Sequence, residues 1–372
     1  MRDGATATPS LPRTVLDAAA AAPRTARARR FLEAGEPGPR WTVGRNAESA
    51  ALAIAGLVSG LLDDRAAPGD TWQGLPVRAM SGLPAGSRVA NCSTSIAPVD
   101  VARRLASLGV DPVPYAELAA ASAGLPAVLP LPDFVREQRE DFELYRSDWE
   151  ALFGAMADEP SRQCLADILC YRLSADPAYM TGYGVRLRDQ YFEPFLQLTG
   201  EVFVDAGGFD GDTTEEFCTR YPDYQRVHLF EPSGRNMAAA RRRLEGRANI
   251  CFHELGVSDE ASELVFDADA GSASAVGEGS ERIRVVALDE YLGEVPTFIK
   301  MDLEGWELHA LRGCARTIAA HRPKLAIAVY HRASDFREIP ALVRSLCADY
   351  RVFLRHYTQG WSETVMFFVP PT

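Results

Sequence analysis

A glycine turn rich in acidic residues follows an apolar run in the second half of the chain. The stretch EVFVDAGGFDGDTTEEF covers residues 201–217. Glycines allow the backbone to approach a ligand closely, and a helix that starts after the turn would present N–H groups to an anion. A carboxylate before the first glycine would repel a pyrophosphate, however, and would suit a ligand with positive charge. The candidate ligand contacts of this turn are Asp205, Gly207, Gly208, Asp210 and Gly211.

S-adenosylmethionine fits this turn better than NAD does. It carries positive charge on a sulfonium and an ammonium group and has no phosphate, so the position of Asp205 favours it over NAD. The alternative is that Asp205 only caps the helix that follows the turn.

Two later segments add candidate contacts for the nucleoside part of such a cofactor. The apolar run RVHLFEP ends in Glu231, 26 positions after Asp205. A carboxylate there could accept hydrogen bonds from both ribose hydroxyls, a role that NAD and S-adenosylmethionine sites share; the alternative is a surface acid. Ser258 and Asp259, in GVSDE, could receive an adenine amino group, although these residues are also common in turns.

Ionisable side chains also end the last two apolar runs that are followed by helical patterns. Asp302 and Glu304 follow TFIKM, and His331 ends KLAIAVYH. Lys300 would point the same way as Asp302 if both lie in a strand. These residues are candidates to contact an acceptor substrate, although His331 could equally be a structural residue. A divalent metal held by Asp302 and nearby acidic residues is conceivable, but no cluster has the spacing of a metal site, so no metal is predicted.

An irregular aromatic segment, YMTGYGVRLRDQYF, precedes the glycine turn. Its Tyr183 and Tyr191 could cover a substrate pocket, or could simply cover the edge of a sheet. We therefore count both as candidate substrate contacts.

The pattern of elements predicts an α/β protein with two sheets. We expect an N-terminal arm over residues 1–35, disordered or helical, and a small Rossmann-like α/β domain over 36–130. A helical connecting segment is expected over 131–195, since apolar residues recur there at helical spacing. Residues 196–372 predict a doubly wound sheet of alternating strands and helices that ends in an antiparallel hairpin.

The last domain resembles the FkbM family of S-adenosylmethionine-dependent methyltransferases. The resemblance rests on FVDAGGFDGDTT, FEPS, VALDEYL, FIKMDLEGWELHALRGC and AVYHRASDFREIP, which occur in this order. Gly208 and Phe209 replace the alanine and asparagine that are usual in the family's turn, so any contact of that asparagine would be lost. The resemblance implies a class I methyltransferase fold and, typically, O-methylation of sugars or secondary metabolites.

The expected chemistry is in-line attack of a substrate hydroxyl on the methyl group of the sulfonium. A neutral alcohol must lose its proton, and His331 is the predicted base, because a carboxylate near a sulfonium should stay a weak base. Asp302 would then orient the cofactor or the acceptor, and which of the two residues is the base stays open.

Composition excludes several classes of protein. The net charge of −12 and the pI near 5.1 argue against a nucleic-acid partner, and no apolar run is long enough to cross a membrane. The seven cysteines show neither disulfide nor zinc spacing, which predicts a reducing cytoplasm. The expected partner is a small-molecule acceptor, and a homo-oligomer is left open.

Two other functions are consistent with parts of the sequence. The first is an NAD(P)-dependent, sugar-modifying oxidoreductase or epimerase that uses the N-terminal sheet, although the turn after Trp41 keeps only Gly44 of a dinucleotide fingerprint. The second is a non-catalytic protein that binds S-adenosylmethionine.

Overall fold

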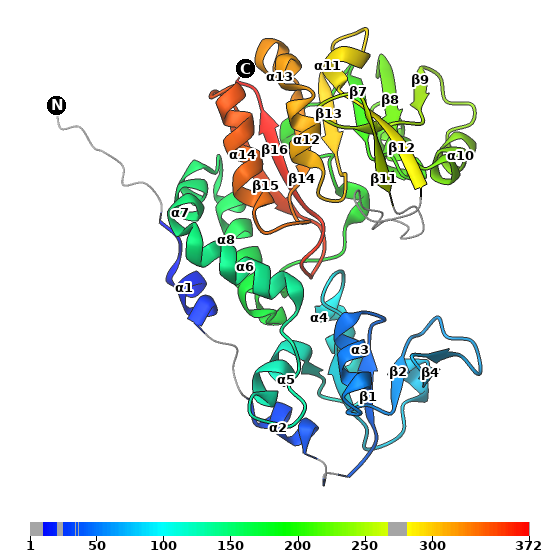
Figure 1. Ribbon diagram of the computed structural model, residues 1–372, viewed down its shortest axis with the longest axis vertical. Helices are drawn as coiled ribbons and strands as arrows, with labels where there is room; N and C mark the ends of the chain where they lie inside the picture. The colour runs from blue at the N-terminus through cyan, green and yellow to red at the C-terminus, as the bar shows by residue number, and fades with distance from the viewer. Residues whose placement is uncertain (1–9, 21–24, 34, 36, 267–280, 372) are drawn as a thin grey trace, which may run out of the picture. The chain divides into compact units, whose positions relative to one another are not determined.

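The computed structural model describes residues 10–20, 25–33, 35, 37–266 and 281–371 (Figure 1). The chain divides into two compact units. The N-terminal unit comprises Met1–Ser147, Gln163–Val185 and Tyr357–Ser362, and the C-terminal unit comprises Asp148–Arg162, Arg186–His356 and Glu363–Thr372. Within the part of the chain that is described, no helix is long and apolar enough to span a bilayer.

A six-stranded sheet forms the centre of the N-terminal unit. Its strand order is β3-β4-β2-β1-β5-β6, and all neighbours are parallel except β3 and β4. The strands are β1 (Arg40–Val43), β2 (Gly60–Leu62), β3 (Thr71–Trp72), β4 (Leu75–Arg78), β5 (Arg88–Asn91) and β6 (Val113–Pro114). The helices are α1 (Arg13–Ala20), α2 (Ala26–Leu32), α3 (Ala47–Ile54), α4 (Pro98–Ser107), α5 (Tyr115–Ser122) and α6 (Asp133–Leu144).

Of the expected N-terminal arm, residues 1–9, 21–24 and 34 lie outside the described residues, and α1 and α2 account for most of the rest. The predicted helical segment contains α6, α7 (Arg146–Ala155) and α8 (Glu159–Ser174), followed by the 3₁₀ turns Pro177–Met180, Leu187–Asp189 and Pro194–Leu196.

The C-terminal unit is built on a seven-stranded sheet with the order β15-β16-β14-β13-β7-β8-β9. The strands are β7 (Val202–Ala206), β8 (Arg226–Phe230), β9 (Ile250–His253), β13 (Phe298–Met301), β14 (Lys324–Ala328), β15 (Arg351–His356) and β16 (Thr364–Val369). All neighbours are parallel except the two pairs that involve β16. The order reverses between β7 and β13, and open α/β sheets bind ligands at such a point, beyond the carboxyl ends of the strands.

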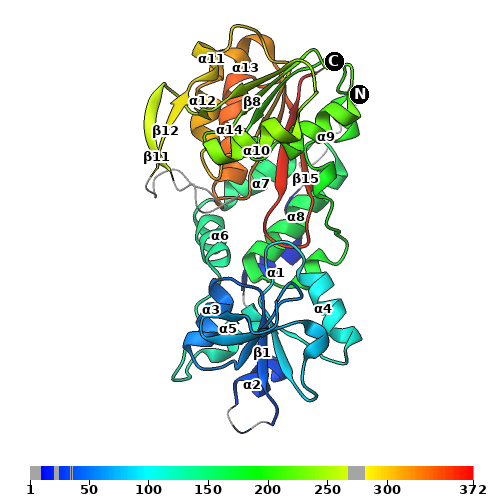
Figure 2. The same cartoon turned by 90° about the vertical axis from the view of Figure 1, so that its right-hand side faces the viewer.

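Helices lie on both faces of this sheet (Figures 1 and 2). They are α9 (Asp212–Arg220), α10 (Gly234–Arg243), α11 (Leu288–Tyr291), α12 (Glu307–Arg312), α13 (Ala315–His321) and α14 (Asp335–Leu346). Helices α9 and α10 pack on one face, and α11 to α14 pack on the other. The residues of β7 and β13 are buried throughout, as expected for central parallel strands that are covered on both sides.

The predicted fold class is confirmed: the unit has alternating strands and helices and ends in the antiparallel pair β15–β16. One part differs from the prediction. Between β9 and β13 the chain adds a three-stranded sheet with the order β10-β12-β11, made of Gly256–Val257, Ser262–Phe266 and Glu281–Val286. The first of these strands has only two residues, and residues 267–280, between the other two, lie outside the described part. The sequence analysis did not recognise this sheet.

Candidate active site

Asp205, near the end of β7, is fully buried and paired with Lys300. The strand register places Asp205 opposite Lys300 in β13, and Lys300 Nζ lies 3.0 Å from Asp205 Oδ1. The other oxygen, Oδ2, accepts a 2.7 Å hydrogen bond from the Thr214 hydroxyl. Burial alone would lower the pKa of Lys300, but the charge of Asp205 raises it above its usual value. The sequence-based argument that Asp205 offers a free negative charge to a cationic ligand is therefore wrong, because Lys300 compensates that charge.

The ion pair with Asp205 also determines where the Lys300 side chain lies. Its side chain is 3% exposed, and its Nζ donates a 2.7 Å hydrogen bond to the carbonyl oxygen of Gly207. In this structure Lys300 therefore supports the glycine turn and does not face an acceptor, contrary to the expectation from the sequence.

The backbone N–H groups at the start of the glycine turn are already hydrogen-bonded. Gly207 N and Gly208 N donate to the carbonyl oxygen of Phe230 at 3.0 and 2.9 Å, and Phe209 N donates to Glu231 Oε2 at 3.1 Å. A phosphate at a glycine-rich turn is normally held by such N–H groups. The start of this turn therefore lacks the free donors that a pyrophosphate needs.

Close packing explains the first glycine of the turn. Gly207 has φ +80°, and a Cβ at this position would overlap the carbonyl oxygen of Asp302. Gly208 packs against the side chain of Leu229 in the same manner, and Gly211, with φ +85°, is the residue before α9. The turn after β7 and the loop after β13 are thus in direct backbone contact.

Glu231 lies directly after β8 and faces the glycine turn. Its Oε1 accepts hydrogen bonds from Ser233 N at 2.9 Å and Asn236 Nδ2 at 3.4 Å, and its Oε2 accepts only the bond from Phe209 N. Burial raises its pKa above the usual value for a glutamate. Because a carboxylate has about four acceptor positions, Oε2 keeps one free for a ligand hydroxyl.

Ser258 and Asp259 belong to a network that the sequence did not reveal. Ser258 Oγ donates to Asp259 Oδ1 at 2.9 Å and accepts from Trp306 Nε1 at 3.1 Å, and His309 Nδ1 lies 3.2 Å from Asp259 Oδ2. The rings of Trp306 and His309 stack at a centroid distance of 4.1 Å. A Cβ at Gly313 would overlap the carbonyl oxygen of Ser258, so this glycine allows α12 to approach the loop.

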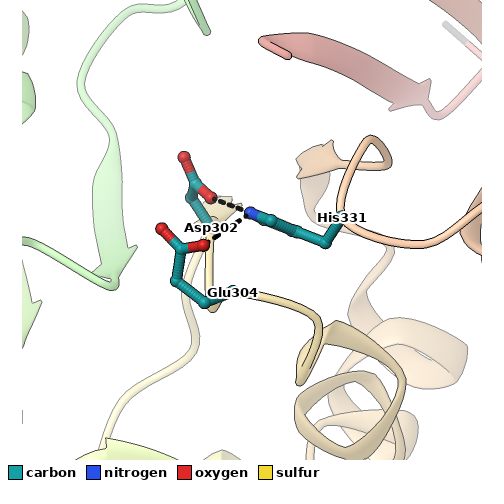
Figure 3. A group of neighbouring side chains, drawn as sticks. All are labelled: Asp302, Glu304 and His331. Atoms are coloured by element: carbon teal, nitrogen blue, oxygen red, sulfur yellow. Dashed lines mark ion pairs between the residues drawn. The ribbon is translucent and has the colours of Figure 1, made fainter. Parts of the chain in front are cut away.

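Asp302, Glu304 and His331 meet at the carboxyl edge of β13 and β14 (Figure 3). His331 Nε2 lies 3.3 Å from Asp302 Oδ1 and 3.3 Å from Glu304 Oε2. On the other side of the ring, Nδ1 lies 3.1 Å from Glu307 Oε1. Glu307 Oε1 also accepts a 2.7 Å bond from Leu303 N, so it holds the turn that carries Glu304 at φ +52°.

The environment of His331 bears on its expected role. Burial lowers the pKa of the imidazole, but Glu307, Glu304 and Asp302 outweigh this effect and raise the pKa well above its usual value. This direction favours the protonated ring, which donates protons and does not accept them. The role of His331 as the general base, and the choice between His331 and Asp302, stay predictions.

Tyrosines orient the Asp302 carboxylate. The Tyr191 hydroxyl donates to Asp302 Oδ2 at 2.6 Å, and the Tyr330 hydroxyl lies 3.4 Å from Oδ1. Burial and the charge of Asp302 raise the pKa of Tyr191, so its phenol stays a donor. Gln190 Nε2 donates to both the Tyr191 oxygen, at 2.9 Å, and Glu363 Oε2, at 2.8 Å. Tyr191 is thus part of the wall around Asp302.

Two predicted site residues have other partners. The Asp210 carboxylate pairs with Arg243 Nη2 at 2.5 Å, which ties the glycine turn to α10. Tyr183 belongs to the N-terminal unit, where its hydroxyl donates to Asp167 Oδ2 at 3.0 Å. The structure thus brings Tyr191 to Asp302 but gives Tyr183 a partner in the other unit.

Sequence reasoning missed six residues that contact the candidate site residues or their partners: Thr214, Trp306, Glu307, His309, Tyr330 and Glu363. Glu307 had a signal in the sequence. It lies three residues after Glu304 at the start of a helical pattern, where a glutamate can reach back to the preceding backbone N–H groups. Thr214 contacts Asp205 nine residues before it, across the glycine turn, and the others depend on contacts between segments farther apart in the chain.

Comparison with known proteins places this edge of the sheet in a known domain. Residues 205–358 match the model of the methyltransferase FkbM domain. The crystal structure of methyltransferase FkbM from Methylobacillus flagellatus KT matches with a TM-score of 0.73 at 24% identity, over 96% of this chain and 98% of that chain. At this identity the match shows a shared fold.

Weaker structural matches cover about half of the chain. Aeropyrum pernix fibrillarin, solved in complex with natively bound S-adenosyl-L-methionine, matches with a TM-score of 0.34 at 12% identity, over 49% of this chain and 71% of that one. Precorrin-6y C5,15-methyltransferase from Geobacter metallireducens GS-15 matches with a TM-score of 0.32 at 12% identity, over 47% and 83%. No curated protein gives a significant sequence match.

Proposed function

We propose that the C-terminal unit, in which residues 205–358 match the model of the methyltransferase FkbM domain, binds S-adenosylmethionine and methylates a hydroxyl group of a small molecule, such as a sugar or a secondary metabolite. The observation that carries the proposal is the backbone contact between Gly207 and Asp302. It joins the turn that would hold the cofactor to the carboxylate that would orient the acceptor.

The residues of the carboxyl edge fit this cofactor. Gly207 and Gly208 pack against the carbonyl oxygen of Asp302 and the side chain of Leu229, so the absence of side chains holds the turn close to the loop after β13 and to β8. Glu231 Oε2 keeps one acceptor position for a ribose hydroxyl, and Ser258 and Asp259 lie beyond the next strand for the adenine. When bound, S-adenosylmethionine supplies an electrophilic methyl group.

The side chains around Asp302 would hold the acceptor. Tyr191 and Tyr330 fix the carboxylate by donating toward it, so its remaining acceptor positions have a defined direction. Asp302 accepts the hydrogen bond of the acceptor hydroxyl and orients its oxygen. Positioning of this kind supplies much of the rate of a group transfer.

The turn argues against the NAD(P)-dependent alternative, since the N–H groups of Gly207, Gly208 and Phe209 are already bonded within the protein. In the N-terminal unit, Gly44, the one glycine of the dinucleotide fingerprint that the sequence keeps, packs against the backbone of Cys92 and so has a structural partner.

Replacing Glu231 with alanine is expected to weaken binding of S-adenosylhomocysteine by about 1–3 kcal/mol, the cost typical of losing a hydrogen bond to a charged group. Isothermal titration calorimetry measures this. Glu245→Ala, which removes an exposed acid after α10, is the matched control and should bind like the unmodified protein. Equal affinity of the Glu231 variant would remove this residue from the cofactor site.

Catalysis is tested with Asp302→Asn. Labelled S-adenosylmethionine and small-molecule extracts of the native source are incubated with the protein, and mass spectrometry detects a compound that gains one methyl group. The variant should transfer methyl at least about 100-fold more slowly while it still binds S-adenosylhomocysteine. A protein that binds this ligand but methylates nothing, with or without the substitution, would be a non-catalytic binder.

A further inference from the structure

Asp302, Glu304 and His331 lie close enough together to share a metal ion (Figure 3). Each residue offers one ligand atom, and these atoms lie within 4.8 Å of one another. The two carboxylates come from the loop after β13, and the imidazole comes from the loop after β14, with Nε2 directed at both carboxylates. We propose that these three side chains bind a divalent metal cation.

The distances within the cluster fit a shared metal ion better than hydrogen bonds from a protonated His331. Nε2 is 3.3 Å from each of the two carboxylate oxygens. Charge-assisted N–H···O bonds are shorter, at about 2.7–2.9 Å. Adjacent ligand atoms around an octahedral ion with bonds of about 2.1 Å are separated by about 3.0 Å, and those around a tetrahedral ion by about 3.4 Å. The two observed nitrogen–oxygen separations lie between these two values.

His331 provides a second, independent observation. Its side chain is only 8% exposed, yet neither ring nitrogen makes a hydrogen bond of good geometry within the described residues. Buried polar groups nearly always have a partner. A cation between Nε2 and the two carboxylates would give this nitrogen the missing partner.

The charge around the ring also favours a cation. Glu307 and Asp335 form a second group with His331, so four carboxyl groups surround one imidazole. A proton on His331 adds one positive charge to this group, whereas a divalent cation adds two and contacts Asp302 and Glu304 directly. The ion therefore relieves more of the repulsion between the acids.

The ligand set indicates the kind of metal. Two carboxylate oxygens suit Mg²⁺ and Mn²⁺, and one imidazole nitrogen extends the set toward first-row transition metals. The side chains of Asp302 and Glu304 are 19% and 27% exposed, so the remaining coordination positions face solvent. Water and a substrate oxygen can occupy them.

The role of the ion rests on the proposed function, whereas its binding does not. A divalent cation lowers the pKa of an oxygen bound to it, so an acceptor hydroxyl on the ion would release its proton to solvent without His331. The oxygen then forms a bond to the methyl carbon as the bond from that carbon to sulfur breaks. The products are the methyl ether, S-adenosylhomocysteine and one proton.

Binding is measured with Mn²⁺ as the probe. The full chain is first dialysed against a chelator, and electron paramagnetic resonance then follows free Mn²⁺ during a titration. We expect one bound ion per chain. Glu304→Gln and His331→Asn should weaken binding roughly 10–100-fold or more, since loss of supporting partners alone costs this much.

Glu294→Gln is the matched control, because it removes the carboxylate 3.0 Å from Nε2 of another buried histidine, His228. It should leave Mn²⁺ affinity unchanged. Glu304→Asn guards against misfolding: Glu304 has φ +52°, a conformation that asparagine adopts readily, and the shorter neutral side chain withdraws the ligand.

Several results would overturn the inference. It fails if the chain binds no Mn²⁺, or if both Glu304 variants bind it as tightly as the unmodified protein does. Calorimetry with S-adenosylhomocysteine in the presence of chelator tests the proposed function separately. Ligand binding without Mn²⁺ binding refutes the metal site alone, and Mn²⁺ binding without ligand binding refutes the cofactor proposal alone.

Discussion

Replacing Lys300 with methionine is expected to destabilise the C-terminal unit by about 3–5 kcal/mol. Asp205 has no exposed surface, and Lys300 is its only charged partner within 4 Å among the described residues. Methionine fills a similar volume but leaves a buried negative charge uncompensated. It also removes the 2.7 Å hydrogen bond to the carbonyl oxygen of Gly207, so the glycine turn should loosen. Differential scanning calorimetry measures the loss as a lower midpoint of the transition of this unit.

The double variant Asp205→Asn/Lys300→Met separates charge from packing. It removes both charges and retains an acceptor for the Thr214 hydroxyl, so it should be clearly more stable than Lys300→Met alone. If the single and double variants unfold at the same temperature, the uncompensated charge of Asp205 is not the cause of the loss.

The ion pair shows what the sequence could not reveal. The acid before the glycine turn was recognised, and its importance was inferred from repulsion of a pyrophosphate. Its partner lies 95 residues later, and the pairing depends on β13 lying beside β7, an order that local patterns do not specify. A one-residue shift of this register would place Lys300 on the opposite face of the sheet. Periodicity predicted both strands, but not which of their residues are neighbours.

The structure supports the predicted preference for a ligand without phosphate, but for a different reason from the one drawn from the sequence. The sequence argument used the charge of Asp205, which Lys300 compensates. The structure offers hydrogen bonds instead: Phe230 and Glu231 occupy the N–H groups of Gly207, Gly208 and Phe209. A phosphate would have to break these bonds to reach the N–H groups. A nucleoside without phosphate does not need these N–H groups as donors. The inference about the ligand class therefore rests on the backbone and on Glu231.

The cluster around His331 was predicted in position but not in chemistry. Residues that end parallel strands share one edge of a sheet, so Asp302 and His331 could be placed together from the sequence. The raised pKa of His331 has its largest raising contribution from Glu307, which begins a helix and approaches the opposite ring nitrogen at 3.1 Å. Spacing along the chain gave no sign of this approach. The proposed metal site combines residues of two loops, so spacing along the chain did not show the cluster either.

Replacing Gly207 with alanine is expected to abolish measurable cofactor binding, with a loss of affinity for S-adenosylhomocysteine of about 100-fold or more, or at least about 2.7 kcal/mol. Two effects add up at this position. Alanine at φ +80° is strained by about 1–2 kcal/mol, and its Cβ would overlap the carbonyl oxygen of Asp302. The overlap can be relieved only if the turn after β7 and the loop after β13 move apart. Isothermal titration calorimetry at a temperature where both proteins are folded measures the change.

Gly246→Ala separates these two effects. Gly246 has nearly the same backbone conformation, φ +81°, but a Cβ there meets nothing within 4 Å. This variant should therefore lose about 1–2 kcal/mol of stability from strain and keep its affinity for S-adenosylhomocysteine. If Gly207→Ala binds the ligand as tightly as Gly246→Ala does, contact between the glycine turn and Asp302 is not needed for the cofactor site. The cofactor would then have to bind elsewhere on the edge of the sheet, without the turn.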